Sequence, residues 1–401
     1  MSEVVNIPQL RFPEFNGEWE EKALGVVATI TTGSTPSTSN NEYYDGDVAF
    51  VSPADIQGNR IVRSTKTTIT ELGLSVVREI KKRSTLFVCI GSTIGKVSQA
   101  GVNCATNQQI NALTAKNSFD NDFIYSLLEF KAPRIKLLAG VQAVPQINKS
   151  EFSRFKFTFP LLPEQQKIAA FLTAVDNKIE QLSKKQELLG EYKKGLMQKI
   201  FSQAIRFKAD DGSEFPDWEE KKLGDLIAEI SDGGTPPTSN KGNFGGGINW
   251  VVIDDIRDEI RITKETLTET GLSNSSSKLW KPETIILSTG ATIGRVGIAK
   301  IYTTTKQGVC GIVVNQFTSN LFLKYWFIFN INLLKRFSQG SSIKEVRPPT
   351  LIKFDISTPS LPEQTKIANF LSSIDSKIEQ VGKQLDESKQ FKKALLQQMF
   401  V

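Results

Sequence analysis

The sequence predicts an α+β protein of two pseudo-two-fold related halves, in which two α+β domains are separated by two long helices that form an antiparallel coiled coil. Residues 163–201 and 362–400 are copies of one segment, set 199 positions apart without a gap. Each copy carries apolar residues at a spacing of seven, which is typical of a coiled-coil seam. The regions before the copies contain short β-branched runs and turn formers without a βαβ alternation, which indicates an α+β fold.

The repeat extends beyond the helical segments and suggests the domain boundaries. The sequence Trp-Glu-Glu-Lys at 19–22 recurs at 218–221, and Thr-Ile-Gly at 93–95 recurs at 292–294. Between such islands the halves differ, which indicates one scaffold that carries two different surfaces. We expect a first domain at residues 1–160, a first helical region at 161–205, a second domain at 206–359 and a second helical region at 360–401.

Within the two domains, β-branched runs predict strands and longer apolar segments predict buried helices. Glycine and proline, for example at 33–36 and 233–236, predict the turns between them. The expected strands are Val48–Val51, Thr85–Ile90, Ile248–Ile253 and Thr284–Leu287, and the expected helices are Asp122–Phe130 and Leu321–Phe329.

The helical regions predict two rods of similar length. Proline followed by glutamate at 163–164 suits a helix N-terminus, and about 39 residues at 1.5 Å each give roughly 58 Å. Lys193 and Lys392 interrupt the apolar seam, and we expect Lys193 to weaken the pairing at its end. The seam residues are Ile168, Leu172, Val175, Ile179, Leu182, Leu189, Leu196 and Ile200 in the first copy, and Ile367, Leu371, Ile374, Ile378, Val381, Leu385, Leu395 and Met399 in the second.

A seam helix of this length requires a partner, and the other copy supplies one. The alternative is that each helix packs independently on its own domain. A two-fold axis across the rods would make them antiparallel, and one along the rods would make them parallel. Only the first places the mixed domains at opposite ends, so we expect the antiparallel arrangement.

Composition and charge narrow the class of protein. The chain has 401 residues and a net charge of +6, which is spread along its length and is compatible with a polyanionic partner. No apolar run approaches the roughly 18 residues of a membrane span, and the first residues lack a signal-peptide pattern, so we expect a cytoplasmic protein without membrane contact. Three cysteines without paired spacing predict reduced, buried thiols.

The chain lacks the residues of the common catalytic and metal sites. It contains no histidine, which excludes histidine bases and histidine metal ligands. Residues 91–96 resemble a phosphate loop, but three residues separate the glycines instead of four, and Val97 follows where Ser or Thr would bind magnesium. No Gly-x-Gly-x-x-Gly motif follows a predicted strand. We therefore expect no catalytic residue, no metal site and no cofactor in this chain.

Polar turns repeated in both halves are the candidate nucleic-acid contacts. Their N–H groups and hydroxyls suit phosphates, and Asn, Gln, Arg and Lys can read base edges in the major groove. For any one residue, an ordinary surface turn or a solvated charge is the alternative. The candidates in the first half are Thr35, Thr38, Ser39, Asn40, Arg60, Arg63, Lys66, Lys96, Asn107, Gln108 and Gln142. Those in the second half are Thr235, Thr238, Ser239, Asn240, Lys241, Arg257, Arg261, Lys264, Arg295, Lys306, Gln307 and Lys344.

A Pro-x-Leu-Pro-Glu-Gln motif stands directly before each long helix, at 160–165 and 359–364. Each half also has a Trp near its start, a Leu-Gly pair and a Gly-x-Thr-Pro turn, at 33–36 and 233–236. With these residues the whole chain resembles the specificity subunit of a type I restriction–modification enzyme. The two copies differ little in these motifs, although Thr32 before the first turn is Asp232 before the second.

The resemblance implies a function and partners. Each variable domain would be a target recognition domain that reads one half of a split sequence in double-stranded DNA. The helices would set the spacer and dock two modification subunits, which carry S-adenosylmethionine and methylate adenine. Two restriction subunits would add translocation and cleavage driven by ATP and magnesium, so this chain itself would be non-catalytic.

Two other functions stay open at the level of sequence. An autonomous DNA-modifying enzyme would need a catalytic constellation, which we do not find. A coiled-coil scaffold that never contacts DNA would not need two divergent domains with matched polar turns.

Overall fold

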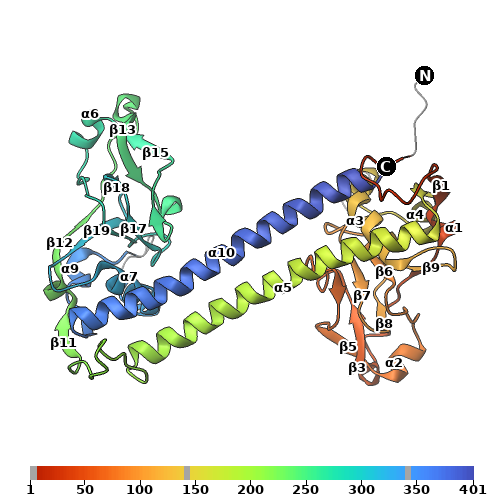
Figure 1. Cartoon of the computed structure of the whole chain (residues 1–401), viewed down its shortest axis with the longest axis horizontal. Coiled ribbons are helices and arrows are strands. Elements are labelled where there is room, and N and C mark those ends of the chain that lie inside the picture. The colour runs from red at the N-terminus through yellow and green to blue at the C-terminus, as the bar shows by residue number, and fades with distance from the viewer. Residues whose placement is uncertain (1–6, 140–144, 339–344) are drawn as a thin grey trace. The chain divides into compact units, whose positions relative to one another are not determined.

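The computed structural model describes residues 7–139, 145–338 and 345–401. It divides into two compact units, Met1–Gln186 with Val381–Val401 and Glu187–Gln380. Each unit holds one α+β domain and one end of each long helix (Figure 1). Among the described residues, no helix combines the length and apolar character that a membrane span requires.

The domain of the first unit is built on a five-stranded sheet in the order β2-β9-β6-β7-β4 and a three-stranded sheet in the order β5-β3-β8, while β1 pairs with β10. The strands pair antiparallel except β4 with β7 and β3 with β8. The central strand β6 is buried along its length, which explains its continuous apolar sequence. The strands are β1 Glu20–Ala23, β2 Ala28–Thr32, β3 Tyr44–Val51, β4 Ile61–Val62, β5 Thr67–Ile69, β6 Thr85–Val88, β7 Val97–Ala100, β8 Cys104–Thr106, β9 Ile110–Ala115 and β10 Lys156–Phe159.

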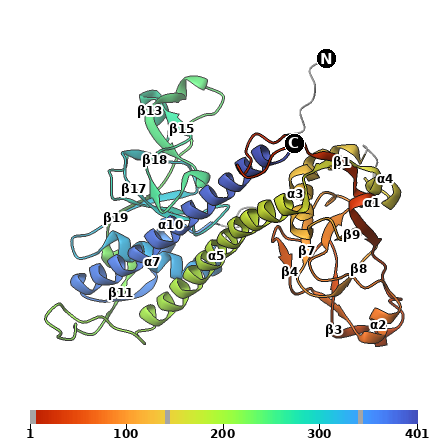
Figure 2. The ribbon, with the colours of Figure 1, turned by 45° about the vertical axis from the view of Figure 1, so that its right-hand side comes forward.

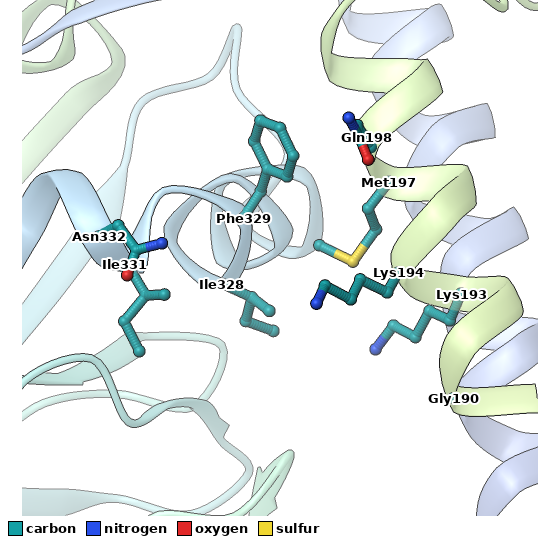
Figure 3. Close-up of a pocket in the computed structure, with 9 residues that line it drawn as sticks. All are labelled: Gly190, Lys193, Lys194, Met197, Gln198, Ile328, Phe329, Ile331 and Asn332. Atoms are coloured by element: carbon teal, nitrogen blue, oxygen red, sulfur yellow. The ribbon is translucent and has the colours of Figure 1, made fainter. Parts of the chain in front are cut away.

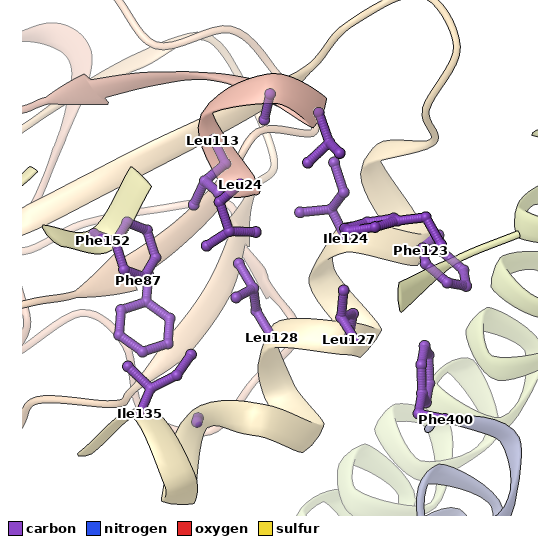
Figure 4. Close-up of a cluster of buried hydrophobic side chains, with 14 of the residues drawn as sticks. Leu24, Phe87, Leu113, Phe123, Ile124, Leu127, Leu128, Ile135, Phe152 and Phe400 are labelled. Atoms are coloured by element: carbon purple, nitrogen blue, oxygen red, sulfur yellow. The ribbon is translucent and has the colours of Figure 1, made fainter. Parts of the chain in front are cut away.

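The helix α3, Asn121–Leu138, packs on the five-stranded sheet. Asp120 caps its N-terminus by accepting hydrogen bonds from the N–H groups of Asp122 and Phe123. Its apolar face completes a core with Leu24, Phe87, Leu113 and Phe152 (Figure 4). The shorter helices are α1 Leu24–Val27, the 3₁₀ helix η1 Asn41–Tyr43, α2 Glu71–Ser75 and α4 Lys149–Arg154.

The domain of the second unit repeats this topology, with sheets β12-β19-β16-β17-β14 and β15-β13-β18 and the pair β11-β20. Its strands are β11 Glu219–Lys222, β12 Ile227–Asp232, β13 Phe244–Val251, β14 Glu259–Ile260, β15 Glu265–Leu267, β16 Ile285–Ser288, β17 Val296–Ala299, β18 Thr303–Thr305, β19 Val309–Val314 and β20 Asp355–Thr358. Its helices are η2 Leu223–Leu226, η3 Lys241–Asn243, η4 Ile253–Asp255, α6 Glu269–Ser273, α7 Asn320–Phe329, α8 Ile331–Arg336 and α9 Pro348–Leu351.

The two long helices are α5, Leu162–Phe201, and α10, Leu361–Met399, and they run antiparallel in each unit. In the first unit, Asp176 of α5 pairs with Lys392 of α10, and the Gln186 amide lies against Gly382. The start of α5 and the end of α10 both lie beside α3 in that unit, where Gln165 accepts from the Asp120 N–H and Lys392 pairs with Glu129 (Figure 2). In the second unit, Lys193 pairs with Asp375, so the lysine expected to weaken the seam has a partner.

The fold class predicted from sequence is confirmed, with two α+β domains and two long antiparallel helices. The predicted strands overlap β3, β6, β13 and β16, and the predicted helices overlap α3 and α7, although α3 extends eight residues beyond the predicted end at Phe130. The seam residues Leu172 and Leu371 are fully buried. The three cysteines are free and buried, and burial raises the pKa of Cys89 and of Cys104 to about 12, which keeps both thiols unreactive.

Candidate nucleic-acid interface

One edge of the five-stranded sheet in the first domain gathers polar turns. Four strand ends lie next to one another there, because β2 ends at Thr32 opposite Asn111, β6 ends at Val88 opposite Ile110, and β7 begins at Val97. The ends of β3 and β8 join them, since the Asn107 N–H donates to the Val51 carbonyl at 3.1 Å. We call residues 33–36, 52–55, 89–96 and 107–109 the first turn edge.

The first turn edge is held by specific hydrogen bonds. The Gly33 N–H donates to the Ile110 carbonyl, and the Thr35 hydroxyl donates to the exposed Gln108 amide at 2.8 Å. A Cβ at Gly33 would lie 2.1 Å from the Asn107 carbonyl oxygen, so this close approach requires glycine.

Two lysines lie beside these turns, one held through its side chain and one through its backbone. The Lys96 ammonium reaches the Pro53 carbonyl, and the Lys66 N–H donates to Asp55 at 2.9 Å. The structure therefore brings four candidates to the first turn edge, Thr35, Lys96, Asn107 and Gln108, and places Lys66 next to it.

A second turn edge, residues 233–236, 252–255, 289–295 and 306–308, occupies the matched strand ends of the second domain. Gln307 is exposed there, at the position that matches Gln108. Arg295 donates to Asp254 at 3.0 Å, and Lys306 lies 5.3 Å from the centre of the Trp250 ring. The Lys264 N–H donates to Asp255 as Lys66 does to Asp55. The same edge also holds Thr235.

The remaining turn candidates lie on loops beside these edges. Asn40 and Asn240 accept hydrogen bonds from the N–H groups of Glu42 and Gly242, and so serve as caps of η1 and η3. Thr38, Ser39, Thr238, Ser239 and Lys241 are exposed on the same loops. Gln142 and Lys344 lie outside the described residues.

Two candidate arginines of the first domain, Arg60 and Arg63, do not lie at the first turn edge. Arg60 donates to Asp176 of α5 at 2.9 Å and forms an ion pair with Asp122 at 3.0 Å, with its side chain 8% exposed. Arg63 pairs with Glu180 of α5 at 2.7 Å. Both therefore contact the long helix. In the second domain, Arg261 pairs with Glu259 and Arg257 is exposed.

The two edges also differ in charge at the position directly before their first turn. In the first, the Thr32 hydroxyl donates to Asn111 at 2.6 Å. In the second, Asp232 stands opposite Cys310, and its buried Oδ1 has no hydrogen-bond partner. Burial, followed by the charge of Glu345, raises the pKa of Asp232 to about 6, although Arg347 and Thr289 favour its charged form. No hydrogen bond of normal geometry joins Asp232 to Thr289.

The sequence did not predict two matched contacts at the starts of the long helices, in which a buried glutamate binds an arginine and a tryptophan. We call these contacts clamps. Glu164 of α5 is buried and accepts two hydrogen bonds from Arg11, each at 2.8 Å, and one from the Trp19 indole. Glu363 of α10 accepts the equivalent bonds from Arg206 and Trp218. These hydrogen bonds raise the pKa of Arg11 and of Arg206. The repeated Trp and the repeated Glu of the Pro-Glu-Gln motif were the available signal.

A cavity in the second unit and the acidic and cysteine side chains were the other places where catalytic or metal chemistry could lie. A cavity of about 650 Å³ in the second unit lies between α5 and α7–α8, and Lys193, Lys194, Met197, Ile328 and Phe329 line it (Figure 3). Its walls are mainly apolar and include no nucleophile paired with a base. Across residues 7–139, 145–338 and 345–401, no group of three or more Cys, Asp or Glu side chains could hold a metal ion.

Comparisons with known proteins agree with this architecture. A sequence profile described as the type I restriction modification DNA specificity domain matches residues 16–189 and again residues 216–387. The type I restriction enzyme MjaIX and MjaVIII specificity subunits of Methanocaldococcus jannaschii are 25% and 24% identical, over 94% and 96% of this chain and 92% of each relative. A candidate MjaX specificity subunit of that organism is 29% identical over 68% of this chain and 65% of its own length.

Solved structures share the fold. The crystal structure of a type I restriction–modification S subunit from M. genitalium has a TM-score of 0.66 at 17% identity, over 98% of this chain and 99% of that one. A chain from a structural study of complex assembly and conformational transition in the type I R-M system has a TM-score of 0.57 at 17% identity, over 94% and 96%.

Proposed function

This chain belongs to the family of type I restriction–modification DNA specificity proteins, and on that premise we propose that it reads a bipartite target in double-stranded DNA, one half-site with each turn edge. The observation that carries the proposal is the exposed glutamine, Gln108 or Gln307, between the same strand ends of two domains. The edges share this glutamine and their turns but differ at other positions, such as Asn107 and Lys306. A glutamine amide can pair with the N6 and N7 atoms of adenine in the major groove.

The surrounding cations support a role in DNA binding. Lys66 and Lys96 lie at or next to the first turn edge, and Lys264, Arg295 and Lys306 at or next to the second. The lysine ammonium is a flexible point charge, whereas the planar guanidinium of arginine presents a rigid pair of donors that matches guanine. The change from Lys96 to Arg295 therefore gives the edges different reading groups. Asp232 adds a further difference, because it places a carboxyl group beside the second edge where the first has the hydroxyl of Thr32.

The long helices support a second role, the docking of two modification subunits. Tyr192 of α5 and Phe391 of α10 stand at matched positions, 56% and 54% exposed. Exposed aromatic residues are typical anchors of protein interfaces, and a surface that occurs twice suits two copies of one partner. In this proposal the modification subunits bring S-adenosylmethionine, and two restriction subunits bring the ATP- and magnesium-dependent activities.

The chain itself acts as the specificity component and not as the catalyst. The proteins it matches are named specificity subunits, and the turn edges offer donors and acceptors for DNA rather than a paired nucleophile and base.

A binding assay with the modification subunits on randomised duplexes tests the proposal. We expect Gln108→Ala to relax base preference in one half-site and Gln307→Ala in the other, each by about 1–3 kcal/mol of discrimination. Gln181→Ala, an exposed glutamine on α5, is the matched control and should leave both half-sites unchanged.

Exchange of a whole domain tests the modular arrangement. Replacing residues 26–159 with the equivalent region of a relative should change one half of the target only. A chain that binds DNA without sequence preference, or whose target changes in both halves after the exchange, would overturn the bipartite proposal. A complex that never binds DNA would favour the scaffold alternative.

A further inference from the structure

Each unit contains the same polar contact between its domain and the long helices. In the first, Asp176 binds Lys392 through Oδ1 at 2.6 Å and accepts from Arg60 through Oδ2 at 2.9 Å. In the second, Asp375 binds Lys193 through Oδ1 at 2.5 Å and accepts from the Tyr325 hydroxyl through Oδ2 at 2.7 Å. Asp375 and Lys392 stand 199 positions after Asp176 and Lys193, so the helices supply identical groups to both contacts.

The lysine of each contact also lies over a tyrosine ring of the domain. Lys392 lies 5.7 Å from the centre of the Tyr125 ring, and Lys193 lies 5.0 Å from that of Tyr325. These tyrosines are not matched in the repeat, because Tyr125 aligns with Lys324 and Tyr325 aligns with Ser126. The two domains therefore reach one arrangement from different positions on α3 and α7.

The side chains of both contacts are shielded from solvent, so each contact can favour one orientation of the domain. The side chains of Asp176 and Lys392 are 8% and 11% exposed, and those of Asp375 and Lys193 are 22% and 16% exposed. Burial, followed by the hydrogen bond to Asp375, raises the pKa of Tyr325, so its hydroxyl stays a donor at neutral pH. A shielded carboxylate whose two oxygens face different partners favours one orientation of the domain over others.

We propose that the pairs Asp176–Lys392 and Asp375–Lys193 are equivalent sockets, which seat a recognition domain on the long helices in a fixed orientation and so define the spacing at which its half-site is read. The inference rests on the proposed function, since spacing has meaning only for a bipartite target. A domain fits a socket when it presents a donor to the aspartate and an aromatic face to the lysine, whatever bases its turn edge reads. The aspartate and lysine are positioning residues.

The second socket is the better one to test. In the first, Asp122 also pairs with Arg60 and Glu129 with Lys392, at 3.0 and 2.5 Å, so the loss of Asp176 would disturb a larger charge network. In the second, Tyr325 is the domain residue that reaches both the aspartate and the lysine.

The experiment compares Asp375→Asn and Tyr325→Phe with the wild-type chain in complex with its modification subunits. DNA affinity is measured across duplexes that keep both half-sites and vary the spacer one base pair at a time. We expect Asp375→Asn to reduce the affinity ratio between the best and the next-best spacer about tenfold, which corresponds to ~1.4 kcal/mol, without altering base preference within either half-site. Asp386→Asn, an exposed aspartate on the same helix, is the control and should keep the wild-type profile.

The milder variant guards against misfolding. Tyr325→Phe keeps the ring over Lys193 and removes only the hydroxyl, so it should fold and still flatten the spacer profile. Without DNA, both variants should show faster hydrogen exchange in α7 than the control. An unchanged spacer profile in Tyr325→Phe would overturn the inference. A wild-type chain without any spacer preference would refute the proposed function. The socket is tested separately by hydrogen exchange, and equal exchange rates of the α7 amides in the variants and the wild type would refute it.

Discussion

A fragment of residues 1–204 contains one domain and one complete long helix, and we predict that it forms a homodimer through that helix. In the whole chain, the core of the first unit includes Leu395, Leu396 and Met399 of α10 and Phe400, which follows this helix directly. The Phe400 ring lies 5.3 Å from Phe123 and 6.3 Å from Trp19. The repeat provides close equivalents of these four residues in the fragment itself: Leu196, Met197, Ile200 and Phe201.

The expected affinity follows from these contacts. A two-fold dimer would bury four such side chains at each of two equivalent places, so eight in all, at about 1.5–3 kcal/mol each, or ~12–24 kcal/mol. Association costs about 4–15 kcal/mol in lost freedom and ordering. The difference between the midpoints of the two ranges is a net binding free energy of about 8 kcal/mol. This corresponds to a dissociation constant on the order of 1 μM.

Lys193 provides the decisive perturbation. In the dimer it would take the place of Lys392 and face Asp176 of the other copy, as it faces Asp375 in the whole chain. Lys193→Glu would replace two charge-assisted hydrogen bonds, worth about 1.5–3 kcal/mol each, with like-charge contacts and should weaken the dimer about 100-fold or more. Lys185→Glu, at an exposed position of the same helix, is the control.

Sedimentation of the fragment with its modification subunit measures the association. We expect a dimer that binds a palindrome built from the first half-site. A fragment that stays monomeric at tens of micromolar, or a Lys193→Glu variant that associates as well as Lys185→Glu, would refute this reasoning.

Three further predictions concern the spacer, pH and chemistry. Insertion of one heptad after Lys185 should lengthen the preferred DNA spacer and leave each half-site intact. An unchanged spacer in the binding assay would show that the helices do not set the spacer length. The pKa of Asp232 lies above its unfolded value, so its ionisation should lower stability as the pH rises from about 4 to about 6. Asp232→Asn should therefore raise stability at pH 7.5 by about 1–2 kcal/mol, after discounting for solvent screening, but not at pH 4; equal shifts in thermal unfolding at both values would contradict this. The purified chain should transfer no methyl group to DNA by itself, and labelling that persists after trace modification subunit is removed would show the opposite.

The helices were predictable because their information is local and periodic. A seven-residue spacing of apolar side chains identifies a buried seam without knowledge of the partner, and Leu172 and Leu371 are indeed fully buried. The duplication alone allows a parallel or an antiparallel pair, and the antiparallel one was expected because it places the two domains at opposite ends. The existence of strands such as β6 and β16 could also be predicted, since short apolar runs between turn formers indicate buried strands.

The roles of the charged residues could not be predicted in the same way. Arg60 suits DNA by residue type, yet it contacts Asp176, which lies 116 positions away in the sequence. In the sequence Lys193 interrupts the apolar seam, and no local pattern shows its partner, because Asp375 is 182 positions away. Such pairings depend on which strand and helix surfaces face each other, and no local pattern encodes them. The gathering of Thr35, Lys96 and Gln108 at one edge likewise required the strand order.

The two clamps at the helix starts bear on how such a chain could originate. The segment that carries Arg206 continues directly from α5, whereas the segment that carries Arg11 meets α10 through space, with the Leu10 N–H donating to the Gln398 carbonyl at 2.9 Å. The same clamp therefore forms where its arginine segment is covalently continuous with the neighbouring helix and where it is not. A peptide link between the two is not needed to form the clamp. An ancestral gene that encoded a single domain and helix could have produced a self-paired protein, and duplication and fusion of that gene would have freed each half to mutate its turn edge separately. New pairs of half-sites could then arise by recombination between alleles, with no change to the helices that join them.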